Sequence, residues 1–182
     1  MAGYPAELVE HWEGAGEPMT IRPIRPDDAP AHEAFFHRLS PEDVRFRFFA
    51  AIRELSPEQL RRFTRPDYER DIAFVAVREA TGETVGVARL ARTEIPGVAE
   101  FAVVVQPDMR DHGLGRHLMQ RLIDWAPAHG IAEIRGEVLA ENANMLSFCR
   151  SLGFTLSHIR GNPETVQALL KLPPARTHGA AS

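Results

Sequence analysis

Hydrophobic residues recur along the chain at two spacings, which predicts a mixture of strands and amphipathic helices. Short apolar runs that are rich in β-branched residues and bounded by turn residues are typical of buried strands. Apolar residues three and four positions apart indicate helices instead. On this pattern, strands are expected at residues 20–22, 71–79, 85–92, 100–105, 134–139, 154–160 and 165–172.

Capping residues predict where the first helices begin. Asp27 or Asp28 can cap a helix that runs to about Leu39. Ser40 and Ser56 each precede a proline and can cap two further helices. A serine oxygen accepts a hydrogen bond from a free N–H group of the first turn, and proline is tolerated there because it lacks an N–H.

Two more helices are expected in the second half of the chain. One follows Gly113 and runs to about His129, with Gly130 as its stop signal. Pro127 should bend the last turn of this helix or end it early, because proline cannot donate to the helical ladder. The other helix follows Asn142.

The length and the element pattern favour one principal domain. A chain of 182 residues can bury a substantial core. Residues 1–18 are rich in glycine and proline and predict a flexible N-terminal arm outside the core, while residues 173–182 predict a disordered tail. The domain is therefore expected over residues 19–172. Its predicted class is α/β (α+β), with a mixed, mainly antiparallel sheet of about six to seven strands and helices on both faces.

Composition and charge narrow the classes of partner. The formal net charge is −4, from 21 basic and 25 acidic residues, so no nucleic-acid-binding surface is indicated. The single cysteine excludes an internal disulfide and fits a reducing, cytoplasmic location. No secretion signal and no membrane span are expected, because the apolar runs are too short. We expect a monomer or a homodimer.

The histidines show no metal-binding pattern. His112 and His117 are five positions apart, so they would not share one helical face. Contact with phosphate or with solvent is the role expected for both. No metal is predicted.

The stretch Glu100–Arg116 combines an apolar strand, a glycine-rich turn and the start of a helix. The run Val103–Val105 reads as the end of a buried strand, and Pro107 stops it. Gly113 and Gly115 then open a helical pattern. This arrangement offers free backbone N–H groups and a positive dipole end to an anion. Because a side chain would hold a phosphate away from the backbone, the glycines indicate a phosphate-binding turn.

Two common phosphate loops do not fit this turn. A Walker loop needs Gly-Lys-Ser/Thr, which is absent, and Leu118 stands where a dinucleotide fingerprint needs its third glycine. An ordinary strand-to-helix turn remains an alternative. The remaining pattern, Arg110-x-x-Gly113-x-Gly115, resembles the acyl-CoA pyrophosphate loop of the GNAT superfamily of N-acetyltransferases.

A second stretch strengthens this resemblance. Asn142 is followed by a helical pattern that ends in Leu152-Gly153-Phe154, which resembles the second signature of the same superfamily. Gly153 suits the left-handed residue just past a helix end, and Phe154 can cover the last turn. The resemblance covers roughly residues 20 to 172.

Membership of this superfamily implies that acetyl-CoA is the cosubstrate and that it lies between two splayed strands. In the resembled fold, the pantetheine arm pairs with backbone near Val103 and Val105, and the amides from Asp111 to Arg116 hold the pyrophosphate. Asn142 matches a position that binds the cofactor from the second helix. The cofactor-binding residues implied by the resemblance are Val103, Val105, Arg110, Asp111, His112, Gly113, Leu114, Gly115, Arg116 and Asn142.

Acetyl transfer to an amine requires a base. A lysine amine with a pKa of about 10.4 is neutral about once in 2,500 molecules at pH 7, a deficit of roughly 4.6 kcal/mol. A carboxylate can accept that proton as the amine attacks the thioester. Glu100, at the start of the central strand, is the candidate base. Glu137 is its rival, since some members of the superfamily place their base at the matching position, and either residue could instead be an exposed acid at a strand edge.

One position departs from the resembled pattern. Many GNAT enzymes carry a tyrosine seven residues after the asparagine, where it can protonate the departing thiolate. That position is Cys149 in this chain. A thiol could serve as the acid, but we interpret Cys149 as a small apolar core residue.

The segments 67–74, 86–89 and 99–103 resemble the GNAT domain of bacterial Pat-type protein lysine acetyltransferases. Those enzymes modify lysines of acyl-CoA synthetases, and the glutamate that matches Glu100 is their base. The resemblance therefore implies a protein lysine acceptor, with an acyl-CoA synthetase as the candidate protein. A small amine, such as a polyamine, amino acid or drug, is the alternative acceptor. A non-catalytic acyl-CoA sensor is the alternative to an enzyme.

Two segments are candidates for the acceptor site. The acidic loop of Asp67, Glu69 and Asp71 would suit a cationic acceptor. The segment from Arg45 to Phe49 is either an amphipathic helix with solvated arginines or a wall of the acceptor site.

Overall fold

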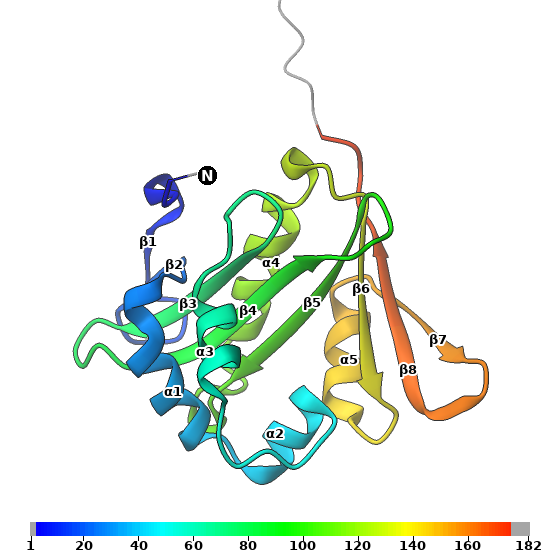
Figure 1. Ribbon diagram of the computed structural model, residues 1–182, viewed down its shortest axis with the longest axis horizontal. Helices are drawn as coiled ribbons and strands as arrows, with labels where there is room; N and C mark the ends of the chain where they lie inside the picture. Colours follow the sequence, from blue (N-terminus) through cyan, green and yellow to red (C-terminus); the bar gives the residue numbers. More distant parts are fainter. Residues whose placement is uncertain (1–2, 176–182) are drawn as a thin grey trace, which may run out of the picture.

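The computed structural model describes residues 3–175, which form an eight-stranded sheet with helices on both faces (Figure 1). The strand order is β1-β2-β3-β4-β5-β6-β8-β7. The strands are β1 Glu10–Trp12, β2 Met19–Pro23, β3 Ile72–Arg78, β4 Thr84–Arg92, β5 Val98–Val105, β6 Glu133–Leu139, β7 Thr155–Ile159 and β8 Asn162–Lys171. The α-helices are α1 Ala29–Arg38, α2 Pro41–Phe48, α3 Pro57–Thr64, α4 Leu114–Trp125 and α5 Ala143–Ser151.

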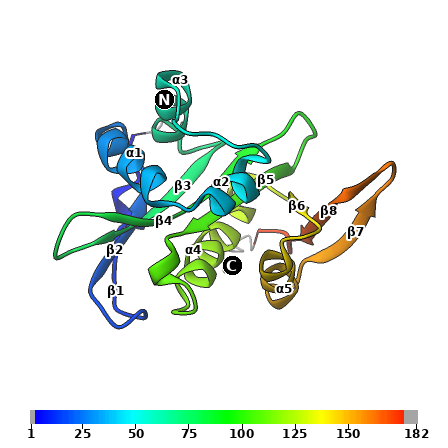
Figure 2. The ribbon, with the colours of Figure 1, turned by 90° about the horizontal axis from the view of Figure 1, so that it is seen from below.

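The predicted fold class is confirmed. Only β5 and β6 are paired in parallel among the described strands, and every other neighbouring pair is antiparallel. Figure 2 shows α1, α2 and α3 on one side of the sheet and α4 and α5 on the other.

The helix boundaries follow the local signals closely. Ser40 and Ser56 each accept a hydrogen bond from the third residue of their helix, so both predicted caps are confirmed. The helix after the glycine turn ends at Trp125, and a separate 3₁₀ turn spans Pro127–His129. Pro127 therefore ends the α-helix early, as expected from its missing N–H.

The sheet has one strand more than predicted, and that strand lies in the predicted N-terminal arm. Residues Glu10–Trp12 pair antiparallel with β2, and Trp12 packs against the main core cluster. Its ring stacks on His117 of α4, with 4.6 Å between centroids, and Glu10 contacts the same histidine. The prediction of a flexible arm is therefore wrong for this segment, because the glycines and prolines mark the turns on either side of β1.

Replacing Trp12 with alanine should lower the free energy of unfolding by about 1–2 kcal/mol, because the apolar contacts with the core and the stacking on His117 are lost. The midpoint of urea denaturation measures this effect. Val9→Ala is the matched control, since Val9 is an exposed residue next to the same strand. Equal midpoints for wild type and Trp12→Ala would mean that β1 contributes no stability.

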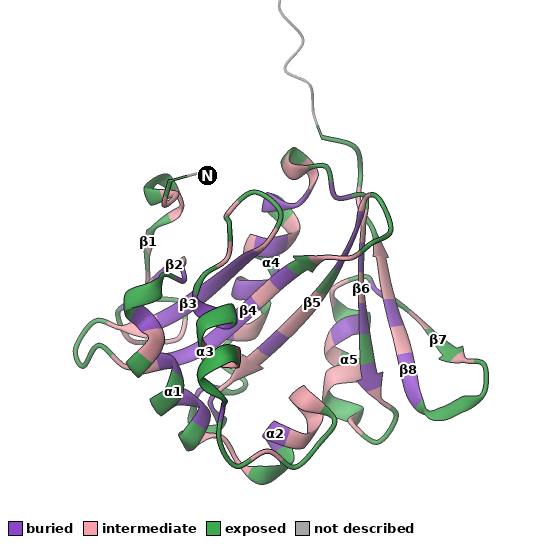
Figure 3. Ribbon diagram, viewed as in Figure 1, coloured by how far each residue is buried: buried purple, intermediate pink, exposed green. Residues whose placement is uncertain are grey.

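The core lies on both faces of the sheet (Figure 3). On the α4 and α5 face, Leu114 and Leu118 pack against Val103. On the α1–α3 face, Phe35 and Val75 belong to a cluster against which Val104 packs. Alternate residues of β5 thus serve opposite faces, which matters for the site below.

The structure describes only the first three residues of the predicted C-terminal tail, 173–182. Residues 173–175 have no regular secondary structure, and the rest of the predicted tail, 176–182, lies outside the described residues. Within residues 3–175, no helix is both long and apolar enough to cross a bilayer.

Candidate active site

The central feature of the site is a separation between β5 and β6. The two strands pair in parallel only over Val98–Glu100 and Glu133–Arg135. Beyond Glu100, β5 continues beside β4 while β6 stays paired with β8, and the two strands diverge (Figure 1). The edge of β5 from Phe101 onward therefore offers backbone N–H and C=O groups to an extended ligand.

A cleft of about 960 Å³ occupies this separation. Its walls come from α2, β5, the loop before α4, β6 and α5. Its size is at the upper end of the range for small-molecule sites. The cleft brings together most of the residues that the sequence predicted to bind a cofactor: Val103, Val105, Arg110, Asp111, Gly113, Leu114, Gly115, Arg116 and Asn142.

One end of the cleft is the predicted phosphate turn. None of the N–H groups from Asp111 to Arg116 donates a hydrogen bond to another described residue, although the next one, of His117, bonds to the Gly113 carbonyl. Asp111 and Gly113 both adopt left-handed backbone conformations, with φ of 62° and 82°. Such turns direct successive N–H groups into a shared concavity that suits an anion.

Backbone conformation explains why position 113 is glycine, but it does not explain the glycine at position 115. A Cβ on Gly113 would meet no atom within 4 Å, so the positive φ is what favours glycine there. A Cβ on Gly115 would lie 3.5 Å from Val105 and 3.7 Å from Phe148, which are ordinary contacts. The fold itself would therefore accept alanine at position 115.

The two arginines of the predicted loop are engaged with other elements. Arg110 pairs with the buried carboxylate of Asp43 on α2. Arg116 donates to the Ser151 hydroxyl at the end of α5, with Nη2 2.7 Å from Oγ. Their side chains tie the loop to both flanking helices.

Both candidate bases lie on the cleft. Glu100 is the last residue of β5 that pairs with β6, and its exposed side chain lines the cleft. Glu137 is exposed and lines the cleft from β6. Neither carboxylate makes a hydrogen bond or an ion pair with any other residue in the described part of the chain. Both are therefore open to solvent and to a ligand.

Asn142, His112 and His117 differ in how their positions compare with the predicted roles. The Asn142 side chain accepts from the N–H of Met145 at 3.2 Å and so caps α5 at the rim of the cleft. His112 is exposed and does not line the cleft. The prediction that His117 meets phosphate or solvent is wrong, because its ring stacks on Trp12 and contacts Glu10. Sequence spacing could not reveal this pairing, since β1 lies far away along the chain.

Cys149 of α5 is fully buried in the main core cluster. Burial raises the pKa of its thiol to about 11. No described side chain forms a hydrogen bond with it, and it does not line the cleft. These observations favour the interpretation of Cys149 as a packing residue.

Replacing Cys149 with alanine should reduce stability by about 1 kcal/mol and leave turnover largely intact, because only buried contacts are lost. Thermal unfolding and steady-state kinetics on the same preparation test this. A hundredfold fall in kcat with an unaltered melting temperature would instead show that the thiol takes part in catalysis.

The acidic loop does not line the cleft. Asp67 Oδ1 accepts from the N–H groups of Glu69, Arg70 and Asp71, and so it closes a local turn. Asp71 Oδ1 accepts from the N–H of Arg92. The expectation that this loop receives a cationic acceptor is therefore not supported by its position.

The segment Arg45–Phe49 contributes directly to the site. Phe46 and Phe49 line the cleft. Arg47 is half-buried, and its guanidinium lies 4.7 Å from the ring centroid of Phe48, so it is only partly solvated. Arg45 is also half-buried, and it pairs with Glu141. The segment therefore forms a wall of the cleft.

Within residues 3–175, no group of three or more histidine, cysteine, aspartate or glutamate side chains is placed to hold a metal ion.

Comparisons with known proteins agree with this geometry. The model of the acetyltransferase (GNAT) family matches residues 33–154. A Pseudomonas aeruginosa protein named acetyltransferase PA5475 is 36% identical over 150 residues, which cover 80% of this chain and 81% of that protein. The [ribosomal protein bS18]-alanine N-acetyltransferase of Escherichia coli is 42% identical over 62 residues, which cover 34% of this chain and 42% of that enzyme.

Structural similarity extends further along the chain. The crystal structure of the GNAT domain of S. lividans PAT aligns with a TM-score of 0.85 and 26% identity, covering 93% of this chain and 100% of that domain. The fold, the separated strands and the family match point to one conclusion. The chain belongs to the acetyltransferase (GNAT) family.

Proposed function

We propose that this acetyltransferase moves the acetyl group of acetyl-CoA to a lysine side chain of a protein, with Glu100 as the general base. One observation carries the proposal. An unpaired carboxylate stands where β5 and β6 separate, in a cleft whose far end presents unbonded backbone N–H groups.

Family membership supplies acetyl-CoA as the donor, and the chain has groups that fit each part of it. The amides from Asp111 to Arg116 would hold the pyrophosphate, because each is a free donor at a helix start. The open edge of β5 at Val103 and Val105 would pair with the amide-bearing pantetheine arm. Asn142, at the rim, would contact the donor from α5.

The assignments of the remaining loop residues to the donor site differ in how well they are supported. The guanidinium of Arg110 forms an ion pair with Asp43, so Arg110 positions the loop against α2. Its assignment to the donor site rests on the motif alone. Leu114, Gly115 and Arg116 contribute through their backbones. His112 is a peripheral member of the set, since it faces solvent.

The chemistry needs a proton acceptor rather than a covalent intermediate. The neutral amine attacks the thioester carbonyl, a C–N bond forms, the C–S bond breaks, and CoA leaves as a thiolate. Glu100 takes the proton that the amine loses, directly or through water. Direct attack fits this chain because the buried thiol of Cys149 has no neighbouring base and does not reach the cleft.

Glu100 is preferred to Glu137 on position. It lies at the vertex of the two strands, where a donor that runs along β5 would place its thioester. Glu137 lies further along β6, on the opposite wall. The Pat-type resemblance of the segments around Glu100 supports the same choice.

A lysine acceptor is supported by two likenesses of different kinds. The sequence around Glu100 resembles Pat-type lysine acetyltransferases, and the whole fold is similar to the GNAT domain of S. lividans PAT. The likeness to the bS18-alanine enzyme favours a second acceptor, the amine of an alanine in a protein. Both acceptors are primary amines and need the same base.

Steady-state kinetics with acetyl-CoA and lysine-containing peptides test the proposal, with release of CoA thiol as the readout. We expect saturable thiol release that depends on the peptide and yields an Nε-acetyl-lysine product. Acetylation confined to an α-amine would support the second acceptor. Binding of acetyl-CoA without transfer to any amine would contradict catalysis.

A further inference from the structure

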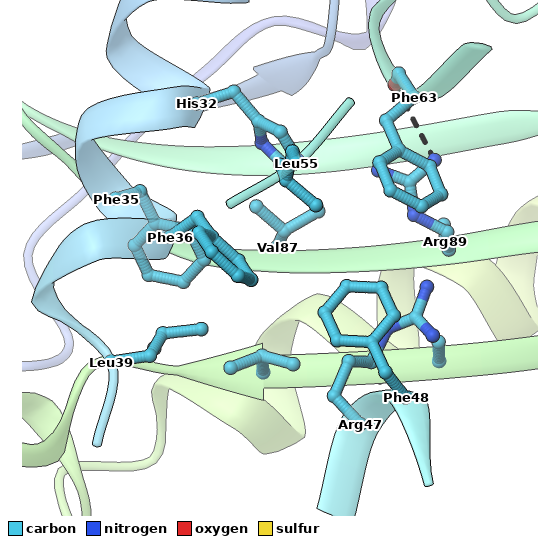
Figure 4. A pocket seen from close by; sticks show the side chains of 12 residues that line it. His32, Phe35, Phe36, Leu39, Arg47, Phe48, Leu55, Phe63, Val87 and Arg89 are labelled. Atoms are coloured by element: carbon cyan, nitrogen blue, oxygen red, sulfur yellow. Dashed lines mark hydrogen bonds between the residues drawn. The ribbon is translucent and has the colours of Figure 1, made fainter. Parts of the chain in front are cut away.

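A second, smaller cavity lies under α1, α2 and α3, next to the cleft (Figure 4). Its volume is about 30 Å³, which is room for a small polar group. Most of its lining is aromatic or aliphatic, but Arg47, Arg89 and His32 also line it. Arg47 and two residues of β5, Ala102 and Val104, line both this cavity and the cleft.

The cavity is a concentration of positive charge without a matching acid. The guanidinium groups of Arg47, Arg62 and Arg89 all lie over the ring of Phe63, at 5.7, 5.2 and 4.5 Å from its centroid. None of these arginines forms an ion pair with a described residue. The charge of Asp71 acts on Arg89, but no ion pair forms.

Arg62 is exposed and lies outside the cavity lining, whereas Arg47 and Arg89 line the cavity and are half-buried. Like charges this close repel one another, and partial burial strengthens the repulsion. Burial, with a contribution from neighbouring arginines, lowers the pKa of both Arg47 and Arg89. Among the described residues, the Arg89 side chain makes one hydrogen bond, a long one with Nη1 3.4 Å from the Phe63 carbonyl oxygen, and the Arg47 side chain makes none. A bound anion would relieve this arrangement.

An unpartnered histidine lines the same cavity. His32 is 7% exposed, and its Nδ1 has no hydrogen-bond partner among the described residues. Burial, followed by the charges of Arg89 and Arg47, lowers the pKa of His32 to about 4, so its ring is neutral at pH 7. A neutral imidazole can still donate one hydrogen bond. A buried polar atom left unpaired destabilises the protein, and a hydrogen bond to a ligand would offset that cost.

The register of the sheet connects this cavity to the candidate base. Arg89 of β4 is directly opposite Ala102, and the residue opposite Glu100 is Ala91. Arg89 and Glu100 are therefore diagonal neighbours on the same face of the sheet. The Cα atoms of such diagonal pairs are typically about 7–8 Å apart. An acceptor whose amine reaches Glu100 would bring groups a few bonds away to Arg47 and Arg89.

We propose that this cavity is an anion subsite of the acceptor, which binds a carboxylate carried by the acceptor through Arg47 and Arg89. The planar guanidinium fork matches the two oxygens of a carboxylate. The role as an acceptor subsite rests on the proposed function. The carboxylate has two possible sources, an acidic side chain near the target amine of a protein or the carboxylate of a small amino acid.

Direct binding tests the subsite without any acetyl transfer. The probe is succinate, added to the full chain while the arginine Nε–H signals are followed by NMR, and succinamide is the uncharged control. We expect saturable shifts of the Arg47 and Arg89 signals with succinate and none with succinamide. Arg89→Met and Arg47→Met should each weaken succinate binding at least tenfold, whereas Arg53→Met, at an exposed arginine, should not.

Absence of saturable shifts in the wild-type protein would overturn the subsite, whether or not the variants fold. Equal succinate affinity in wild type, Arg89→Met and Arg47→Met would overturn it as well. A protein that binds succinate in this way but acetylates no amine would contradict the proposed function and leave the anion site in place.

Paired acceptors then identify the source of the carboxylate. One pair is a peptide with glutamate beside the lysine and the same peptide with glutamine. The other pair is free lysine and lysinamide. We expect kcat/KM to be about tenfold higher for the carboxylate member of one pair, and that advantage should disappear in Arg89→Met while acetyl-CoA affinity is unchanged. No preference in either pair, from an enzyme that acetylates these acceptors, would contradict the acceptor role.

Discussion

Replacing Glu100 with glutamine should lower kcat for acetyl transfer by about 10²- to 10⁴-fold, or about 3 to 5.5 kcal/mol of transition-state stabilisation. Glutamine keeps the shape and polarity of the side chain but cannot accept the proton that the attacking amine loses. Glu100 has no hydrogen-bond or ion-pair partner among the described residues, so the substitution leaves no native contact broken. Stability and acetyl-CoA affinity should therefore hardly change.

The pH dependence of this defect separates loss of a base from a structural fault. As the pH rises toward the pKa of the acceptor amine, near 10.4 for lysine, solvent deprotonates the amine unaided. The rate deficit of Glu100→Gln should therefore shrink with increasing pH. A deficit of constant size across the pH range would indicate that Glu100 acts by positioning instead.

Glu137→Gln is the matched control, because Glu137 is an exposed glutamate on the opposite wall of the same cleft. We expect a mild effect on kcat. If Glu137→Gln is the crippling change and Glu100→Gln is mild, the base lies on β6 and the Pat-like assignment loses its main support.

Replacing Gly113 with aspartate should weaken acetyl-CoA binding by well over tenfold, more than 1.4 kcal/mol, while the fold survives. Aspartate is among the few residues that tolerate the left-handed conformation of Gly113, at φ 82°, and no atom lies within 4 Å of the new Cβ. The added negative charge would stand at the turn whose free N–H groups should hold the pyrophosphate. Calorimetric titration with acetyl-CoA measures the loss.

Gly82→Asp provides the control for backbone strain. Gly82 has φ 76°, and a Cβ there would also meet no atom within 4 Å, but it lies in the turn between β3 and β4. It should match Gly113→Asp in stability and match wild type in acetyl-CoA affinity. Unchanged affinity in Gly113→Asp would remove the turn from the donor site.

Local sequence signals were sufficient for much of the fold and for the donor side of the cleft. The serine caps, the early helix end at Pro127 and the glycine turn depend on residues within a few positions of one another. In the proposed function backbone amides bind the donor, so a short motif is enough to predict most of that site. The separation of β5 and β6 was implied only by the family resemblance, since no local pattern encodes where pairing stops.

Most of the features that sequence reasoning missed depend on contacts between distant segments. The stacking of Trp12 on His117 joins residues about a hundred positions apart, and it holds β1, which pairs with the nearby β2, against α4. The acidic loop was interpreted as a site for a cationic acceptor, but the Asp67 and Asp71 side chains accept hydrogen bonds from backbone N–H groups. Arg47 and Arg89 meet around Phe63 only because α2, α3 and β4 converge. No spacing in the sequence predicts that convergence.

The central claim, that this cleft transfers acetyl from acetyl-CoA to lysine side chains, is tested most directly by product analysis. The purified chain is incubated with acetyl-CoA that is isotopically labelled in the acetyl group and with a cell lysate, and lysines and small amines are analysed by mass spectrometry. The account predicts label on the Nε atoms of defined protein lysines with wild type and Glu137→Gln, and at least a hundredfold less with Glu100→Gln. Label on small amines alone, or equal label with Glu100→Gln, would contradict it.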